Sequence, residues 1–345
     1  MRRTPRRKDK VTSHDVAALA RVSRSAVSRA FTPNASVSEK VRRRVQEAAA
    51  RLGYQPNAIA RSLITRKSRM IGLVMADWSN PFYTSMLQRF SEKLQEHGYQ
   101  LMLLTADDDA GVEHAVRLLL QYQIDKIIIV TGTPSDQLID EAHRAGARLV
   151  ILNRDIHSKV ATCIVVDSTR IGRDVANALL DAGYRRFAMV RGDTGKLLNA
   201  IQRMEGFRAT LRKRGLGSIV LERLTTIGYE AGRAFGNEVA ALRVRPDAVV
   251  CSADVTAIGV LDALRIDQEI DVPAKIAVVG FGNAPAAGWA CTGLASIRLP
   301  LERMMDAAVA AILGDGGPAP GETVVLPAEL EIRSTIRFAK EAAHA

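Results

Sequence analysis

The chain has no apolar run long enough to cross a membrane. Its uninterrupted apolar segments, such as residues 127–130 and 276–279, have the length of a β-strand, whereas a membrane-spanning helix needs roughly 20 apolar residues. The basic residues 1–10 do not lead into the apolar stretch of about 7 to 15 residues that marks a secretory signal. We therefore expect a cytoplasmic protein without a membrane segment.

Cysteine is scarce, and its spacing excludes several kinds of chemistry. Cys163, Cys251 and Cys291 lie far apart, with no CxxC pair and no histidine at a metal-binding spacing, so neither a metal site nor a redox pair is predicted. We expect all three to be buried as small apolar side chains. The motifs GxGxxG, GxxxxGK[ST] and HExxH are also missing, so we expect no cofactor and no catalytic residue.

Acidic residues are rare in the first part of the chain. Residues 1–69 carry 18 Lys and Arg against 4 Asp and Glu, a net charge of +14, which leaves −3 of the total +11 for residues 70–345. A solvated tail is the simplest explanation of a short basic run, and we expect residues 1–10 to form such a disordered tail. From residue 11 the basic segment also has helical periodicity, which favours a folded domain that binds a polyanion.

Three short helices are predicted within residues 11–55. Thr12 can cap the first helix with Asp15 three residues later, Ser23 can cap a second over residues 24–31, and Ser38 precedes a third that Gly53 ends. The second helix has a polar outer face formed by Arg24, Ser25, Ser28 and Arg29. Such a helix-turn-helix fits the major groove of DNA, where arginine reads guanine; the alternative is that these side chains are only solvated surface.

From residue 70 the pattern changes to alternating strands and helices. The chain has 345 residues, of which 47% are hydrophobic, enough for two or three domains. Short apolar runs are separated by helix-length segments, for example residues 82–96, 112–122 and 169–182, a pattern typical of parallel sheets covered by helices on both faces. So many strands favour two doubly wound lobes, the first over about 70–166 and 298–327 and the second over about 167–297 and 328–338, followed by a tail over 339–345.

Three successive segments resemble the LacI/GalR family of bacterial transcription regulators. They read VTSHDVAALARVSRSAVSRAF, VSEKVRRRVQEAAARLGYQPNAIARSL and RMIGLVMADWSNPFY, and the resemblance extends from about residue 11 to residue 337. It implies a helix-turn-helix head, a hinge helix, and a periplasmic-binding-protein-like core that binds a small effector. The family usually has glycine where this chain has Arg21, so we expect modest backbone strain there. With the helix analysis above, the resemblance implies DNA contacts in the head from Thr12, Ser23, Arg24, Ser25, Ser28 and Arg29.

A hinge that becomes ordered only when it gains contacts is expected over residues 56–69. Residues 56–63 read as a helix of about two turns that begins at Pro56 and is too short to persist alone. The resemblance implies that Asn57, Ala60 and Leu63 contact DNA, with Leu63 inserted between base pairs of the minor groove. The alternative is that Ile59 and Leu63 only pack a linker.

The effector cleft should lie where the core strands end. The resemblance implies that its walls include Phe82, Tyr83, Asn153, Arg203, Asp254 and the residue after Phe281, which is Gly282 here, although Asp254 could equally be a helix cap. Relatives usually carry an acid at position 282 and asparagine at 253, where this chain has glycine and alanine. Arg154, Arg191 and Arg223 meanwhile add positive charge, which indicates an anionic or otherwise unusual effector.

The function these observations predict is that of a repressor. We expect a homodimer that binds a pseudo-palindromic, double-stranded operator, because two-fold protein symmetry dictates two-fold DNA symmetry. A small effector in the interlobe cleft would change operator affinity. Two alternatives stay open: a small-molecule binding protein of periplasmic type whose basic head is incidental, and a sugar-active enzyme, which would show turnover.

Overall fold

The computed structural model describes residues 11–32, 35–55, 68–76, 81–130, 132–192 and 198–337, without the side chains of residues 81, 82 and 198. The chain divides into two compact units, one up to Ser68 and one from Arg69. We describe each unit by itself.

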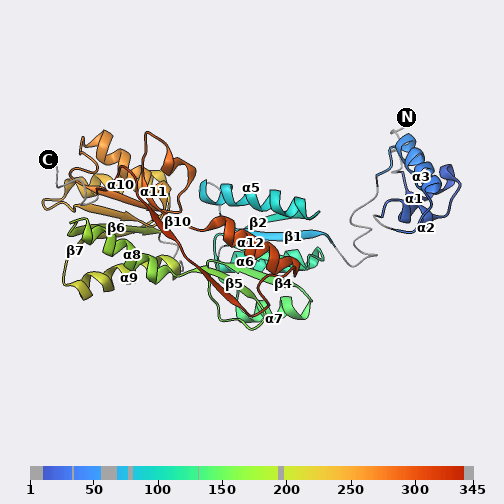
Figure 1. The fold of residues 1–345 in the computed structure, drawn as a ribbon, viewed down its shortest axis with the longest axis horizontal. Helices are drawn as coiled ribbons and strands as arrows, with labels where there is room; N and C mark the ends of the chain where they lie inside the picture. Colours follow the sequence, from blue (N-terminus) through green and yellow to red (C-terminus); the bar gives the residue numbers. More distant parts are fainter. Residues whose placement is uncertain are drawn as a thin grey trace, which may run out of the picture. The chain divides into compact units, whose positions relative to one another are not determined.

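The first unit contains three helices around one small core. They are α1 (Ser13–Ala20), α2 (Arg24–Ala30) and α3 (Glu39–Leu52), labelled in Figure 1. Their buried faces contribute Val16, Val27 and Val45, and five alanines fill the space between these valines. Small side chains allow short helices to approach closely, so even 7- and 8-residue helices acquire a shared core.

The predicted helix caps are confirmed. The Asp15 carboxylate accepts a hydrogen bond from the Thr12 amide at 2.8 Å, the Ser23 hydroxyl accepts one from the Ala26 amide at 3.2 Å, and Gly53 ends α3 with φ 66°. The expected strain at Arg21 is also present, because this residue ends α1 in the left-handed conformation, with φ 52° and ψ 52°.

Two arginines of α3 donate hydrogen bonds to carbonyl groups at the C-terminal ends of the other two helices. The Arg42 guanidinium donates to the carbonyl oxygen of Ala30 at 2.8 Å, and that of Arg44 donates to the carbonyls of Ala20 and Arg21. Carbonyl groups at a helix C-terminus lack partners within the helix. Part of the basic charge of this unit is therefore used to hold the three helices together.

The second unit contains two six-stranded sheets, one in each lobe. In lobe 1 the spatial order is β11-β5-β4-β3-β1-β2, all parallel. In lobe 2 the order is β12-β10-β9-β8-β6-β7, parallel except for the antiparallel pair β10 and β12. The strands are β1 (Met70–Met75), β2 (Gln100–Thr105), β3 (Lys126–Ile129), β4 (Arg148–Leu152), β5 (Thr162–Val166), β6 (Arg186–Gly192), β7 (Ser218–Thr225), β8 (Ala248–Cys251), β9 (Ala277–Phe281), β10 (Ala295–Arg298), β11 (Thr323–Leu326) and β12 (Glu329–Glu331).

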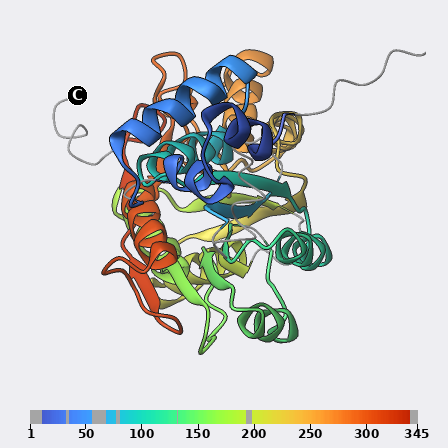
Figure 2. The same cartoon turned by 90° about the vertical axis from the view of Figure 1, so that its right-hand side faces the viewer.

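Helices cover both faces of each sheet. In lobe 1, α5 (Pro81–Glu96) and α12 (Leu301–Leu313) pack on one face, and α6 (Asp109–Gln121) and α7 (Asp136–Arg144) on the other. Figure 2 shows α12 in red opposite α6 and α7 in teal and green. In lobe 2, α8 (Ser168–Asp181) and α9 (Leu198–Arg214) cover one face, and α10 (Tyr229–Ala241) and α11 (Asp254–Asp262) the other. This arrangement confirms the predicted fold class of two doubly wound lobes.

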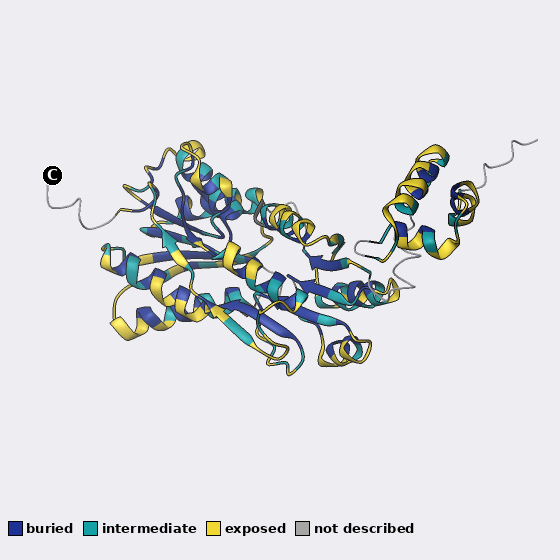
Figure 3. Ribbon diagram, turned by 45° about the vertical axis from the view of Figure 1, so that its right-hand side comes forward, coloured by how far each residue is buried: buried dark blue, intermediate teal, exposed yellow. Residues whose placement is uncertain are grey.

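Burial follows this layering. In Figure 3 the strands are mostly buried, whereas the outer sides of the helices are exposed. A one-turn π-helix, Ala263–Asp267, continues α11, and a 3-10 helix, Pro285–Gly288, follows β9. Within the part of the chain that the structure describes, no helix is both long and apolar enough to cross a membrane.

The chain passes from one lobe to the other at three places. It leaves lobe 1 between β5 and α8, returns between β10 and α12, and leaves again between β11 and β12. Neither lobe is therefore made from one continuous piece of sequence.

The cysteine prediction is wrong for one residue. Cys163 and Cys251 are buried, but Cys291 is exposed. Cys291 lies in the turn after the 3-10 helix, close in sequence to Trp289, whose residue surface is 60% exposed. Composition and spacing do not reveal that this segment lies at the surface.

Candidate functional site

Helix α2 presents a polar face to solvent. Val27 and Ala30 point into the core of the first unit, whereas the predicted DNA-contacting residues of this segment are exposed: Ser23, Arg24, Ser25, Ser28 and Arg29. The hydroxyl oxygens of Ser23 and Ser25 lie 2.9 Å apart. Two guanidinium groups and three hydroxyls can thus meet base edges or phosphates without rearrangement of the core.

Thr12 lies at the start of α1, also exposed. Its amide and hydroxyl both donate to the Asp15 carboxylate, and these hydrogen bonds lower the pKa of Asp15. The remaining predicted DNA-contacting residues, Asn57, Ala60 and Leu63, lie outside the described residues, as do the expected hinge helix and both expected tails.

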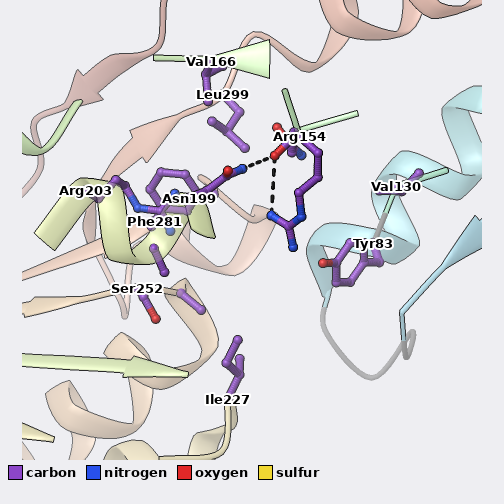
Figure 4. A pocket seen from close by; sticks show the side chains of 14 residues that line it. Tyr83, Val130, Arg154, Val166, Asn199, Arg203, Ile227, Ser252, Phe281 and Leu299 are labelled. Carbon is purple, nitrogen blue, oxygen red and sulfur yellow. Dashed lines mark hydrogen bonds between the residues drawn. The ribbon is translucent and has the colours of Figure 1, made fainter. Parts of the chain in front are cut away.

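A cavity of about 100 Å³ lies between the two lobes of the core. Five of the predicted effector-contacting residues line it: Tyr83, Asn153, Arg154, Arg203 and Gly282. Figure 4 shows Tyr83 on one side, Arg203 on the other and Arg154 between them. The side chain of Phe82 is outside the described residues.

Arg203 projects from α9 and stacks on an aromatic ring. Its guanidinium carbon lies 3.5 Å from the centroid of the Phe281 ring, a cation–π arrangement. Burial, and secondly the positive charge of Arg154, lower the pKa of Arg203 to about 9. The site therefore holds a partly buried cation with no aspartate or glutamate among the described lining residues, a state that an anionic ligand stabilises.

Arg154 and Asn153 follow β4 and form the other polar wall. Arg154 is only 6% exposed, and its terminal nitrogen is 3.5 Å from the carbonyl oxygen of Asn153, to which the Asn199 amide also donates. Burial lowers the pKa of Arg154 and raises that of the neighbouring Tyr83 hydroxyl. Asn153 has φ 57°, a left-handed conformation that asparagine tolerates better than most residues.

Asp254 has a different position from the expected one. It is not among the cavity-lining residues; its carboxylate instead turns into lobe 2, where it accepts hydrogen bonds from the Ser296 hydroxyl at 2.5 Å and the Ala284 amide at 2.6 Å. Burial raises the pKa of Asp254, although these hydrogen bonds oppose the rise. It is not the helix cap either, since Ala253 occupies the cap position of α11.

Sequence reasoning missed several cavity residues and included two arginines that lie elsewhere. Among the missed residues are Ile227, Ser252 and Leu299. Most of them follow a core strand, which was the only signal that could have found them. Arg191 and Arg223 do not line the cavity, and Arg223 pairs with Glu238 on the surface of lobe 2.

Comparisons with known proteins agree with this architecture. Residues 12–57 match the family of bacterial regulatory proteins, lacI family, and residues 68–302 match the periplasmic binding proteins and sugar binding domain of the LacI family. The HTH-type transcriptional regulator DegA of Bacillus subtilis (strain 168) is 29% identical over 333 residues, 94% of this chain and 97% of that protein.

Two further relatives cover most of the chain. Catabolite control protein A of Priestia megaterium is 27% identical over 295 residues, 84% of this chain and 88% of its own length. In structure, the chain is similar to the lac repressor dimer bound to operator and the anti-inducer ONPF, with a TM-score of 0.81 and 22% identity over 95% of this chain and 99% of that chain.

The match of residues 12–57 to a regulatory head excludes the alternative in which the basic segment is incidental. The match over 68–302 covers more than half of the chain and includes both lobes with the cavity between them. The chain therefore belongs to the LacI family of bacterial regulatory proteins, and is a DNA-binding transcriptional regulator with a separate effector-binding core.

Proposed function

We propose that this regulator is a repressor that binds a pseudo-palindromic operator as a homodimer and is controlled by a small molecule in the interlobe cavity. The observation that carries the proposal is the cavity between the lobes, whose lining includes Arg154 and Arg203. A ligand that contacts both lobes changes the free energy of one lobe arrangement relative to another, which is the requirement for control of a distant site.

The DNA-reading element we propose is α2. Arg24 and Ser25 lie at its N-terminal end, where a helix-turn-helix places side chains against base edges, and Ser28 and Arg29 follow one turn later on the same exposed face. Thr12 and Ser23 are proposed phosphate contacts at the starts of α1 and α2. Base contacts set sequence preference, whereas phosphate contacts set general affinity.

The segment over residues 56–69 is proposed as the link between the two units. We infer that Asn57, Ala60 and Leu63 contact the minor groove, where an apolar side chain inserted between base pairs bends the duplex. The change Leu63→Ala is expected to preserve affinity for random duplex and to reduce preference for the operator. Band-shift titrations with operator and scrambled duplexes measure both quantities, and unchanged preference would contradict the role of Leu63.

The effector is proposed to carry negative charge. Two arginines line the cavity, and no aspartate or glutamate is among its described lining residues. Position 282, which faces the cavity, is glycine, so no carboxylate at that position competes for the arginines. Guanidinium groups bind carboxylates through paired hydrogen bonds.

Selection of genomic fragments by the purified protein tests the DNA-binding proposal. We expect enrichment of an inverted repeat, occupied by two copies of the chain as measured by analytical ultracentrifugation of the complex. Arg24→Ala should abolish the enrichment, and Arg212→Ala, which changes an exposed arginine of α9 in the core, serves as the matched control. Recovery of fragments no different from random duplex would overturn the proposal.

We also infer that the chain acts by binding and not by turnover, and that it works in the cytoplasm, where chromosomal DNA lies. Operator affinity and effector affinity are then coupled by one free energy, so DNA must change effector affinity by the same factor by which effector changes DNA affinity.

A further inference from the structure

Two neighbouring residues that line the interlobe cavity carry a buried hydrogen-bond donor and a buried acceptor that have no partner among the described residues. The donor is Nε of Arg154 and the acceptor is Oδ1 of Asn153; neither has a hydrogen-bond partner among the described residues. Both side chains line the cavity. Buried polar atoms in folded proteins are almost always paired, so two adjacent exceptions in a ligand cavity indicate which groups a ligand brings.

The positive charge of Arg154 favours an anionic acceptor for this donor. Arg154 is only 6% exposed. It lies close enough to Arg203 for its positive charge to lower the pKa of Arg203. Asp109 and Tyr83 favour the charged form of Arg154 from the lobe 1 side, but Asp109 does not line the cavity and its Oδ1 accepts the Thr133 amide at 2.9 Å. The cavity itself therefore has an excess of positive charge among its described lining residues.

The acceptor requires a donor that is compatible with this charge. Asn153 Oδ1 can accept from a hydroxyl or from an ammonium group. An ammonium group would lie next to two guanidinium groups, and like charges at such distances repel. A neutral hydroxyl satisfies Asn153 without this repulsion.

We propose that the effector is a small hydroxylated carboxylic acid. Its carboxylate lies between Arg154 and Arg203, and a neighbouring hydroxyl donates to Asn153 Oδ1. This assignment rests on the proposed function, because it takes the interlobe cavity as the effector site. It adds the chemical class of the effector, and it assigns recognition of the carboxylate to Arg154 and recognition of the hydroxyl to Asn153.

The volume of the cavity limits the size of this acid. At about 100 Å³ the cavity is smaller than the roughly 150 Å³ cavity that holds benzene in an engineered protein. A compact acid fits the arrangement of the lobes in this structure, and a six-carbon acid requires the lobes to separate slightly.

Isothermal titration calorimetry with two matched sets of probes tests the assignment on the full chain. The first set is glycerate, propionate and glycerol; the second is gluconate, hexanoate and glucitol. Within each set the first compound has both groups, the second only the carboxylate and the third only hydroxyls. We expect a hydroxy acid in at least one set to bind at least tenfold more tightly than both of its partners.

Three variants separate the two tasks. Arg154→Gln should weaken binding of the hydroxy acid at least tenfold. Asn153→Gly, which relieves the left-handed backbone while removing the acceptor, should retain carboxylate binding and lose the preference for glycerate over propionate, or for gluconate over hexanoate. Arg223→Gln removes an arginine that pairs with Glu238 outside the cavity and should leave the affinity unchanged.

Each other result overturns the inference. Equal or tighter binding of glycerol or glucitol would show that charge is not recognised, and equal binding of propionate or hexanoate would show that the hydroxyl is not. Binding of glucose 6-phosphate with no binding of any of the carboxylates, or no binding of any probe, would also reject the class. Operator preference, measured in parallel by band shift, keeps this outcome distinct from failure of the proposed regulatory function.

Discussion

Arg203 has a pKa of about 9, lowered from that of an ordinary arginine by burial and by the charge of Arg154. The guanidinium is therefore charged at pH 7 to 8 and loses its charge as the pH rises through 9. A bound anion favours the charged form, so the affinity for the effector acid should be constant up to about pH 8. It should then fall, approaching tenfold per pH unit well above 9, because one proton is required for binding.

Calorimetry with the tightest-binding acid between pH 7 and 10.5 measures this effect. In Arg203→Met the residual affinity should be lower and should lack the fall above pH 9. An identical pH profile in the variant would show that another group titrates.

Asp254 should act on the cavity without contacting the ligand. Its carboxylate holds the Ala284 amide, and Ser296, which donates to Asp254, accepts the Asn283 amide at 3.0 Å. Asp254→Asn places an amide group against one of these donors, and an unpaired buried donor costs about 1–3 kcal/mol. We expect a loss of that size in the free energy of unfolding by urea, together with faster hydrogen exchange over residues 282–284.

Asp315→Asn, in an exposed turn, is the matched control and should change neither quantity. If Asp254→Asn left the exchange at 282–284 as slow as in the parent chain, the proposed role in holding this segment would be wrong.

At the level of single residues, local chemistry was predictable and long-range orientation was not. Caps such as Ser23, and the strain at Arg21, depend on neighbours within a few positions, so the sequence contains the necessary information. Asp254 was assigned to the cavity because it follows a strand, but its partners Ala284 and Ser296 are 30 and 42 positions away. Nothing near Asp254 in the sequence indicates that its carboxylate turns inward.

Among the elements, α9 is positioned by a close approach to α8. A Cβ atom at Gly206 would overlap the carbonyl oxygen of Thr169, and one at Gly172 would overlap the carbonyl oxygen of Arg203. Only glycine permits this backbone contact. The same contact sets the position of Arg203, and therefore of one side of the cavity.

Gly206→Ala should therefore weaken both stability and ligand binding. The added methyl group forces the two helices apart, and overpacking of this kind costs about 1–3 kcal/mol or more. We expect a lower urea midpoint and at least a tenfold loss of affinity for the effector acid, measured by calorimetry. Gly228→Ala is the control, because a Cβ atom there has no neighbour within 4 Å; equal effects of the two changes would contradict the argument.

The core strands differ in how clearly the sequence shows them. Residues 127–130 and 276–279 were identified because strands buried on both faces read as apolar runs. Strand β7 was not identified, since it lies at the edge of its sheet and includes Glu222 and Arg223. Edge strand β12, Glu-Leu-Glu, was missed for the same reason, whereas β11, Thr-Val-Val-Leu, is apolar but only four residues long.

Over the whole molecule, positive charge is concentrated in residues 1–69 at a net +14, against −3 for the rest. Operator binding should accordingly depend steeply on salt, because bound phosphates release counterions. A protein with six to ten phosphate contacts loses roughly 10³- to 10⁵-fold in affinity between about 50 and 200 mM salt, and we expect a loss in this range. The effector acid, bound by Arg154 and Arg203 inside the cavity, should lose only a few-fold over the same interval, because buried or partly buried charges are screened less.

Fluorescence anisotropy of a labelled operator measures how steeply DNA affinity falls with salt concentration over this range. Calorimetry of the acid measures the corresponding slope for effector affinity. Similar slopes for DNA and acid would show that the acid binds at an exposed basic surface and not in the cavity.

The last crossing between the lobes has a consequence for how the chain assembles during synthesis. Residues 323–331 supply β11 and β12, which pair with β5 in one sheet and β10 in the other. Until this segment leaves the ribosome, β5 and β10, which are interior strands of the complete sheets, lie at sheet edges, and unpaired edges invite pairing with other chains. One nine-residue stretch thus completes both sheets, and a chain truncated before it would expose β5 and β10 as edge strands.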